Sequence, residues 1–501
     1  PSRDKEEDTD MKIHPKFLLL SLFITSVLSL CHSVTSAQLV PDFRVNDDLT
    51  TNYQLAPRVA ADSSGNFVAV SQDNRFATSQ VYNITVFGQR YSANGVRIGE
   101  NFRVRNQLDT GQSPDIAVKP NGDFIVCWTD RSSSRLVVRL FRFDLTPLTD
   151  IILVSDSNYV NERPRIDNND SGYFVIAWQS FLSPERVLFQ RFDPFGNKIG
   201  NNVNVSDSGV SSRKRYTDVT VRSDGSFIVC WEDNRLDPGL WDIYCQMYSS
   251  NGTKIGSNIL VNDITFDSQT GPKMTSDSSG NFCVTWDEVL AASAYSQYFN
   301  NKGMKLGNSF YVGNSVPGGL DAKPNGEIIF GLADYLPVGQ RMNSDRTFMG
   351  NSFYITAQFP GSYKILSDII VSRNKIISLW QDDRSGNFDI FCNIRSFINP
   401  DSTVNIRQLS AVIPHEPELL QNYPNPFNPV TKIPFQVTRK EFVEITVYDI
   451  LGRRVSRLVS TVLSPGKYEV GFDGTNTAGG LLVCRMKTEE TVTERVMVLL
   501  K

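Results

Sequence analysis

Short apolar runs alternate with polar turns between Ala56 and Phe397, and the same pattern returns at intervals of roughly 50 residues. Its best copy, residues 223–235, reads SDGSFIVCWEDNR: a polar turn, an apolar run, a Trp, an Asp and an Arg. The residue that opens the apolar run recurs as Phe67, Phe124, Phe174, Phe227, Phe282, Ile328 and Ile376. A repeat of this length with about four short strands is typical of a β-propeller blade.

Each copy contains four strand signals. The first strand precedes the anchor by about ten residues, as in Pro57-Arg-Val, and a Gly-centred turn then leads into the strand that carries the anchor. A third strand follows, as in residues 243–248. In four copies a turn with two glycines delivers the fourth strand, and Gly252 and Gly256 are one such pair. Glycine is favoured in such turns because it adopts positive φ without a steric penalty.

The ends of the array predict the number of blades. The seventh copy stops after its third strand, residues 389–397, whereas a single fourth-strand sequence, residues 42–46 (DFRVN), stands before the first copy. Pairing these two segments closes the ring and removes two exposed sheet edges. We therefore predict an all-β protein with a seven-bladed β-propeller over residues 38–397, closed by strand 42–46.

Two motif positions recur after the anchor of the second strand. Five of the six Trp share one position, four residues after the anchor, where we expect packing between blades: Trp128, Trp178, Trp231, Trp286 and Trp380. Two residues further lie Asp73, Asp130, Asp233, Asp334 and Asp382, and Arg75, Arg235 and Arg384 follow after two more. A catalytic residue is normally unique, so we interpret these Asp as acceptors of backbone N–H groups and these Arg as partners of a carboxylate.

A second polar position lies near the start of each innermost strand. Its members are Arg58, Asp115, Arg165, Asp218, Lys273, Gly319 and Asp368. The charges alternate in sign around the ring, and closure places Asp368 beside Arg58. We expect a circle of ion pairs at the mouth of the central channel, on the face where innermost strands begin, and the structural role is favoured. The alternative is a polar funnel with a gap at Gly319 that holds a sugar or peptide.

Composition excludes several kinds of chemistry. The formal net charge of −4 and the lack of a dense Lys/Arg run argue against nucleic-acid binding. The three His, at 14, 32 and 415, lie outside the propeller, which removes His-dependent nucleophilic catalysis and His-ligated zinc there. We expect no metal and no cofactor. The Cys of the repeats read as buried apolar residues, and a disulfide between Cys230 and Cys245 stays open.

The N-terminal residues predict export. Residues 1–10 precede Met11, and a basic segment, an apolar run over 17–30 and a small-residue stretch follow, which is the order of a signal peptide cleaved near Ala37. The apolar run is shorter than the ~20 residues needed to span a bilayer. Cys31 suggests a lipoprotein alternative, but Leu30 stands where a small residue is needed. No later stretch predicts a membrane span.

After Phe397 the repeat ends. Residues 398–419 read as a polar linker, and residues 420–501 carry new strand signals that predict a small Ig-like β-sandwich. The segments NYPNPFNP, VEITVYDILGRRVSRLV, GKYEVGFDG and VMVLLK occur there in order. They resemble the C-terminal sorting domain of type IX secretion cargo. Leu482 departs from that family, which usually has Tyr there.

The resemblance to sorting domains implies a route of export. The signal peptide would carry the chain across the inner membrane, and residues 420–501 would direct it through the outer membrane of a Bacteroidetes-like cell, to be released or held at the surface. The implied partner is the type IX secretion machinery. More loosely, the propeller resembles exported repeat proteins with W-x-D-x-R blades, which implies a fold.

The molecular activity has three candidate classes. The first is a non-catalytic propeller that binds an extracellular glycan or protein. The second is a carboxylate-dependent glycosidase or lyase, which needs two distinct acids facing each other across the channel. The repetition of the acidic positions argues against an enzyme. A structural role in a surface layer is the third.

Overall fold

The computed structural model describes residues 38–500 except for 49, 51, 78–83, 106–110, 157–159, 182–184, 207–211, 334–335, 350–351, 357–361, 398–406, 411–413, 475–476, 478 and 489–490. The predicted signal peptide, with Met11, Cys31 and Ala37, lies outside the described residues, and so does Asp334. In the described ranges no helix is long and apolar enough to cross a membrane.

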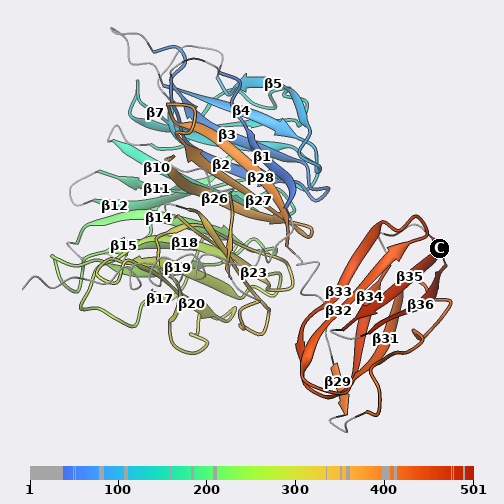
Figure 1. Cartoon of the computed structure of the whole chain (residues 1–501). Helices are drawn as coiled ribbons and strands as arrows, with labels where there is room; N and C mark the ends of the chain where they lie inside the picture. The colour runs from blue at the N-terminus through green and yellow to red at the C-terminus, as the bar shows by residue number, and fades with distance from the viewer. Residues whose placement is uncertain are drawn as a thin grey trace, which may run out of the picture.

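The repeats form seven four-stranded antiparallel sheets, which confirms the all-β fold and the seven blades (Figure 1). Blades 1 to 3 are β2 (Gln54–Ala61), β3 (Phe67–Asp73), β4 (Thr85–Tyr91), β5 (Arg97–Arg103); β6 (Gly111–Val118), β7 (Phe124–Asp130), β8 (Arg135–Phe141), β9 (Ile152–Leu153); and β10 (Asn161–Asn168), β11 (Phe174–Ser180), β12 (Arg186–Phe192), β13 (Lys198–Asn204).

Blades 4 to 6 have the same order from the innermost strand outward. They are β14 (Lys214–Val221), β15 (Phe227–Asp233), β16 (Asp242–Tyr248), β17 (Lys254–Leu260); β18 (Gln269–Ser276), β19 (Phe282–Glu288), β20 (Ser293–Phe299), β21 (Phe310–Gly313); and β22 (Pro317–Ala322), β23 (Ile328–Leu332), β24 (Val338–Met342), β25 (Phe353–Tyr354).

Blade 7 joins the two ends of the array. It consists of β26 (Lys364–Ser372), β27 (Lys375–Asp382), β28 (Asp389–Ser396) and, as its outermost strand, β1 (Gln38–Arg44). β1 pairs antiparallel with β28, with Phe43 opposite Cys392, and Val45 continues the pairing by donating to the carbonyl of Ile390 at 2.7 Å. The strand therefore begins four residues before the predicted segment 42–46. The ladder protects the outer edge of β28.

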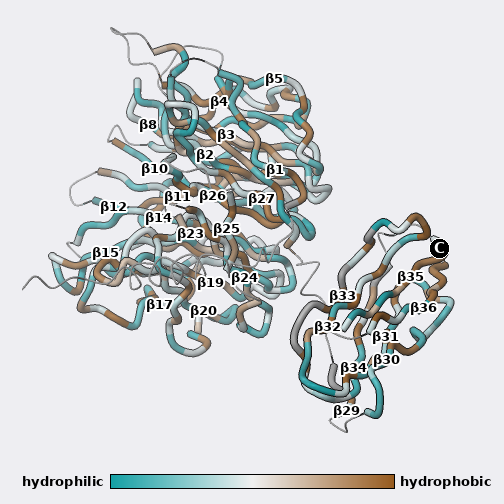
Figure 2. The backbone as a smooth tube through the Cα atoms, viewed as in Figure 1, coloured by the Kyte–Doolittle hydropathy of each residue, from teal (hydrophilic) through white to brown (hydrophobic). Residues whose placement is uncertain are grey.

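The core of the propeller lies between successive blades rather than within one. Each repeated Trp is buried against side chains of the preceding blade, as where Trp231 of blade 4 packs with Val175 and Phe189 of blade 3. Hydrophobic segments, brown in Figure 2, run along the strands of the blades. A single sheet cannot bury both faces alone, so the ring as a whole supplies the core.

The cysteines of the described chain are buried and free. Cys230 and Cys245 lie opposite each other on β15 and β16, as cross-strand neighbours without a disulfide. Burial raises the pKa of both thiols, to about 12 for Cys245. They behave as small apolar residues of the core between blades 4 and 5.

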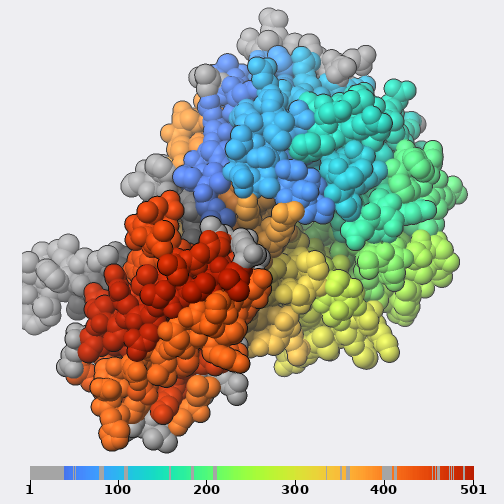
Figure 3. Space-filling view, turned by 90° about the vertical axis from the view of Figure 1, so that its right-hand side faces the viewer, coloured from blue at the N-terminus to red at the C-terminus, as the bar shows by residue number. Residues whose placement is uncertain are grey.

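The C-terminal unit consists of two sheets and forms a separate lobe (Figure 3). The strand orders are β29 (Arg407–Ser410), β34 (Gly466–Asp473), β31 (Val430–Val437), β30 (Glu418–Leu419) and β33 (Arg454–Leu463), β32 (Glu441–Asp449), β35 (Gly480–Lys487), β36 (Val492–Leu499). Side chains from both sheets, among them Phe435 and Ile445, share one core. Leu482, the departure from the sorting-domain pattern, is buried in it.

The segment predicted as a linker contributes two of these strands. β29 and β30 both fall within 398–419, and they form the two edges of their sheet. Edge strands are commonly short and polar, which limits unwanted pairing. Because β29 and β30 are short and the segment around them is polar, the sequence of this segment resembles that of a linker.

The segment NYPNPFNP lies along the free edge of β36, the outer strand of its sheet. Phe427 is buried, donates its N–H to the carbonyl of Val498 at 2.9 Å and accepts from the N–H of Leu500 at 2.8 Å. The side chain of Asn425 accepts a further hydrogen bond of 2.8 Å from the N–H of Val498. The motif thus satisfies backbone groups of the terminal strand.

Candidate functional site

The repeated Trp-x-Asp-x-Arg motif forms a closed hydrogen-bond unit. In blade 4, Asp233 accepts from Trp231 Nε1 at 3.1 Å and from the backbone N–H of Arg235 at 3.0 Å. The guanidinium of Arg235 binds the same carboxylate through Nε at 2.9 Å and Nη2 at 2.5 Å. Its Cζ atom lies 4.1 Å from the centre of the Tyr244 ring, which makes a cation–π contact.

Blade 7 contains the same unit, and blade 1 contains its Asp–Arg part, with Ser71 at the Trp position. In both blades, two guanidinium nitrogens of the Arg donate to one carboxylate oxygen, in the pairs Arg75–Asp73 and Arg384–Asp382, over the rings of Phe87 and Phe391. Asp130 differs, because Ser132 and Ser133 donate to it in place of an Arg at the repeat position. These side chains are occupied by one another, which supports a structural role.

Burial by itself would raise the pKa of Asp233, but the hydrogen bonds from Arg235, Ser212 and Trp231 outweigh it and hold the pKa below its usual range. The balance is the same for Asp382, where Arg384 and Trp380 are the donors. Both carboxylates are therefore charged in the folded propeller at neutral pH.

A cavity of about 680 Å³ occupies the centre of the ring, and all seven residues of the predicted circle line it. The cavity extends from this circle past the next residues of each innermost strand to the turns beyond, where Asp170 and Arg373 lie. Residues that precede the circle on these strands do not line it. The circle therefore forms the inner end of the cavity, whereas the sequence placed it at a mouth on the opposite face.

Three carboxylates of the circle accept a backbone N–H group of the neighbouring blade. Asp115 accepts from the backbone N–H of Ile166 at 2.9 Å, Asp218 from that of Met274 at 2.8 Å, and Asp368 from that of Val59 at 2.9 Å. Each contact reaches from one innermost strand to the next. Blades 2 and 3, 4 and 5, and 7 and 1 are joined in this way.

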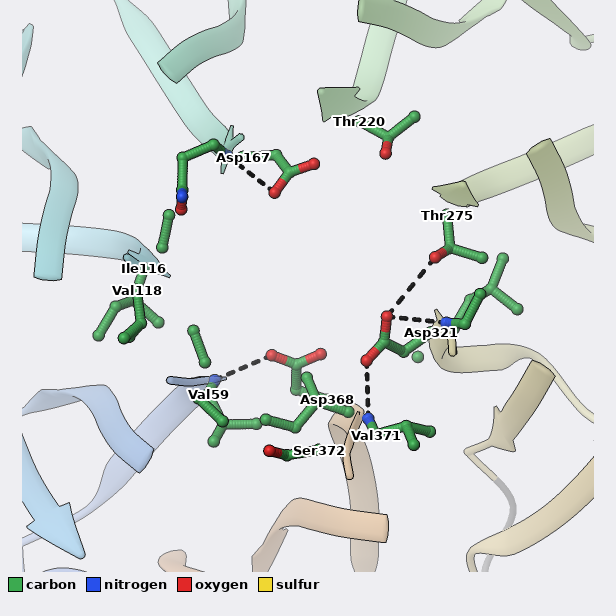
Figure 4. A pocket seen from close by; sticks show the side chains of 18 of the residues that line it. Val59, Ile116, Val118, Asp167, Thr220, Thr275, Asp321, Asp368, Val371 and Ser372 are labelled. Carbon is green, nitrogen blue, oxygen red and sulfur yellow. Dashed lines mark hydrogen bonds between the residues drawn. The ribbon is translucent and has the colours of Figure 1, made fainter. Parts of the chain in front are cut away.

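Two further carboxylates, which sequence analysis missed, lie one layer along the cavity. Asp167 of blade 3 accepts from the N–H of Val221 at 2.7 Å, and Asp321 of blade 6 from that of Val371 at 2.7 Å. Figure 4 shows Asp167 and Asp321 on different sides of the open centre. They join blades 3 and 4 and blades 6 and 7, whose circle residues, Arg165 and Gly319, carry no acceptor side chain.

The pKa of Asp167 and that of Asp321 are both raised to about 7, chiefly by burial, although backbone N–H groups partly offset this. The signal for these residues was present in the sequence. Two positions after the circle the repeats read Ala60, Ala117, Asp167, Thr220, Thr275, Asp321 and Ile370. Only two of the seven blades have an acid at this position, so the position does not form a repeated acidic pattern.

At the two remaining blade junctions, the side chains of these two layers make longer contacts. Arg58 Nε lies 3.6 Å from Asp115 Oδ1, an ion pair between blades 1 and 2. Thr275 Oγ1 donates to Asp321 Oδ1 at 3.5 Å between blades 5 and 6. Of the predicted alternating ion pairs, the described residues therefore show one within contact distance.

Gly319 is not an opening in the wall. It is buried, and a Cβ atom at this position would lie 2.8 Å from the backbone nitrogen of Ile369 and 2.8 Å from its Cγ2 atom. The innermost strands of blades 6 and 7 therefore approach each other too closely for a side chain.

Two cations of the circle have unused donors. Arg165 donates only to the carbonyl of Pro164, at 3.5 Å, and Lys273 has no hydrogen bond or ion pair among the described residues. Burial lowers the pKa of Lys273 to about 7, and repulsion from Arg165 and Arg58 adds to this effect, against attraction to Asp218 and Asp368. Burial and Arg165 likewise lower the pKa of Arg58.

Comparison with known families identifies the C-terminal unit. Residues 421–499 match the secretion system C-terminal sorting domain, as the sequence motifs predicted. The chain is thus a propeller with a type IX secretion sorting domain. This domain implies interaction with the secretion machinery and export to the cell surface or beyond. No curated protein matches the chain.

Several solved structures resemble the propeller at low identity. The polysaccharide lyase Uly1 is 10% identical with a TM-score of 0.48, over 73% of this chain and 99% of that one. A protein of unknown function from Dyadobacter fermentans is 11% identical with a TM-score of 0.44, over 72% and 99%. An α-L-arabinofuranosidase of Fusarium graminearum is 8% identical with a TM-score of 0.40, over 72% and 98%. At these values the likeness says nothing about function.

Proposed function

We propose that this exported propeller binds an extracellular glycan in its central cavity and does not turn it over. The observation that carries the proposal is the cavity of about 680 Å³ whose lining is polar but whose carboxylates hold blades together. This volume lies within the roughly 300–1,000 Å³ of small-ligand sites. It suits one or a few sugar units, whereas a folded partner protein needs a broad surface.

The lining offers the groups that sugars require. Thr220 and Thr275 have hydroxyls, and Asp167 and Asp321 have carboxylates on the cavity wall (Figure 4). Hydroxyl-rich ligands both donate and accept, and such side chains match them. A sugar in the cavity would replace water on these groups.

The hydrogen bonds of the carboxylates argue against hydrolysis. Asp167 accepts from the N–H of Asn168 at 2.8 Å with one oxygen and from that of Val221 with the other. Asp321 is held in the same way by Ala322 and Val371. A general acid or nucleophile must be free to reach the glycosidic bond. The blade junctions account for both residues without catalysis.

The alternative is a carboxylate-dependent glycosidase or lyase, and one observation favours it. Asp167 and Asp321 are a distinct acidic pair on different sides of the cavity, each with its pKa raised to about 7. A carboxyl group that keeps its proton near neutral pH can act as a general acid. In this alternative these two residues are the catalytic pair.

The two functions are separated by measuring binding and turnover together. The purified protein is titrated by calorimetry with a panel of neutral and acidic oligosaccharides, and each mixture is then analysed for shortened or unsaturated products. Binding without product supports the proposed function. Product that disappears in both Asp167→Asn and Asp321→Asn establishes the hydrolase or lyase instead, and a panel without any binding rejects both.

The route to the surface is part of the proposal. Cleavage near Ala37 would release the signal peptide just before β1, which begins at Gln38. The sorting domain would then be removed on release or would hold the protein at the cell surface. Sequencing the N-terminus of the exported protein and measuring its mass test both steps.

A further inference from the structure

We infer that the glycan is acidic, and that Arg58, Arg165 and Lys273 at the inner end of the cavity receive a uronate carboxylate. The inference rests on the proposed function and specifies its ligand. It follows from three features of the cavity: unused donors, the repulsion among the three cations, and a second layer that suits sugar hydroxyls.

The first feature is an excess of donors at the inner end. Both oxygens of Asp218 accept backbone N–H groups, from Val219 at 3.1 Å and from Met274. Asp368 is engaged in the same way by Ile369 at 3.0 Å and by Val59. These acceptors are occupied, whereas the donors of Arg165 and Lys273 face the cavity without an acceptor of that kind. A ligand that fits here must bring acceptor oxygens.

The second feature is electrostatic. Arg58, Arg165 and Lys273 come from blades 1, 3 and 5 and line one cavity, where Arg165 repels Arg58 and both arginines repel Lys273. A carboxylate between them relieves this repulsion and takes hydrogen bonds from charged donors, which are stronger than neutral ones. The planar guanidinium of Arg165 matches the two oxygens of a carboxylate.

The third feature fixes the orientation. Asp167 and Asp321 lie two residues further along their strands than the circle, which is about 7 Å along an extended chain. A carboxylate is disfavoured beside these acids, whereas hydroxyl groups donate to them. A uronic acid has its carboxylate and its ring hydroxyls on different parts of one sugar. It therefore matches the unused donors of the inner end and the acidic second layer together.

The experiment compares digalacturonate with its carboxyl-reduced, neutral counterpart by calorimetry on the purified protein. Loss of one charged contact of this kind corresponds to roughly a tenfold to hundredfold weaker Kd. We expect the reduced disaccharide to bind at least about tenfold more weakly. Lys273→Met should weaken digalacturonate binding by a similar factor and leave the reduced sugar unaffected.

Two further variants make the result specific. Lys302→Met removes an exposed lysine in a turn and serves as the matched control, with unchanged binding expected. Lys273→Arg keeps the charge and should retain most of the affinity. Thermal unfolding of each variant establishes folding, and if Lys273→Met does not fold, Arg165→Met provides the same comparison.

The possible failures are distinct. Equal affinity for the acidic and the reduced disaccharide overturns this inference and leaves glycan binding intact. Equal loss in Lys273→Met and Lys302→Met also overturns it. Binding of an acidic peptide in place of every sugar rejects the glycan, and the absence of any bound oligosaccharide rejects the proposed function and the inference with it.

Discussion

Asn46 donates a hydrogen bond of 2.8 Å from its side-chain amide to Asp389 Oδ1 and accepts one of 2.9 Å from the N–H of Ile390. Blade 4 contains the same arrangement between Asn262 and Asp242, at 2.7 Å, within one continuous repeat. At Asn46 the contact joins the first strand of the described chain to the last copy of the repeat. The bond that completes an ordinary blade is therefore the bond that closes the ring.

Asn46→Ala should open this closure. The carboxylate of Asp389 and the N–H of Ile390, both buried, each lose this partner, at a cost of about 1–3 kcal/mol each in the free energy of unfolding. Urea unfolding should show a similar loss for the matched variant Asn262→Ala. Hydrogen exchange should separate the two, because only Asn46→Ala should expose the amides of β1 and β28. Unchanged protection of β1 in Asn46→Ala would show that the ladder alone closes the ring.

Asp233 should make the propeller sensitive to acid. Its pKa is lowered in the folded state, so its contribution to stability is present above the unfolded pKa of about 3.9 and is lost as the pH falls through the folded pKa. Asp233→Asn should cost about 2–3 kcal/mol at pH 7.

Urea unfolding from pH 6 to pH 3 measures this effect. The stability of Asp233→Asn should fall less steeply with acid than that of the wild type. Asp150→Asn, at an exposed position, is the control and should follow the wild-type curve. Parallel curves for all three proteins would contradict the assignment of Asp233.

Asp167 and Asp321 should make the propeller less stable as the pH rises, the opposite of the effect of Asp233. Their folded pKa of about 7 lies above the unfolded value, so their contribution is fully present below the unfolded pKa and is lost as the pH rises through about 7. The double variant Asp167→Asn/Asp321→Asn keeps an oxygen acceptor for each backbone N–H but cannot ionise.

The measurement is the free energy of unfolding between pH 5 and pH 8. The wild type should lose more stability over this range than the double variant. Asp170→Asn changes an exposed acid at the outer end of the same cavity and controls for the general loss of negative charge. A double variant with the wild-type slope would mean that the two carboxylates ionise normally.

The repeat made most of the propeller predictable. Regular spacing of the anchors located the blades, and the Trp at a constant position implied burial between them, because a residue that recurs at one repeat position meets an equivalent neighbour each time. Trp231 and its equivalents are buried in this way. The sorting domain was predictable from motifs, since Phe427 and Asn425 make contacts that depend on their identity.

The site was less predictable, because it depends on differences between copies. Arg165 and Gly319 have no acceptor side chain, so Asp167 and Asp321 accept the backbone N–H groups of the next blade in their place. This contact joins two blades, and a single repeat does not contain it. The carboxylates of the circle were expected to face cations, yet backbone N–H groups of the next strand lie closer. Pairing by sign alone overlooks the backbone as a partner.

Gly319 shows how an absent side chain can mislead. The sequence suggested a gap, but the neighbouring strand fills it, and the Cβ atom of Ala would lie 2.8 Å from the nitrogen of Ile369. Gly319→Ala should force β22 and β26 apart and destabilise the propeller by about 1–3 kcal/mol, as is typical of overpacking. The control is Gly471→Ala in β34, where a Cβ atom meets nothing within 4 Å.

Urea unfolding and hydrogen exchange measure the effect of Gly319→Ala. Because Ile369 also binds Asp368, which in turn binds Val59, the disturbance should spread to the junction of blades 7 and 1. The amide of Val59 should therefore exchange faster in Gly319→Ala than in the wild type or Gly471→Ala. A stable variant with a protected Val59 amide would show that the strands can separate without cost, and the position would then be open to a side chain after all.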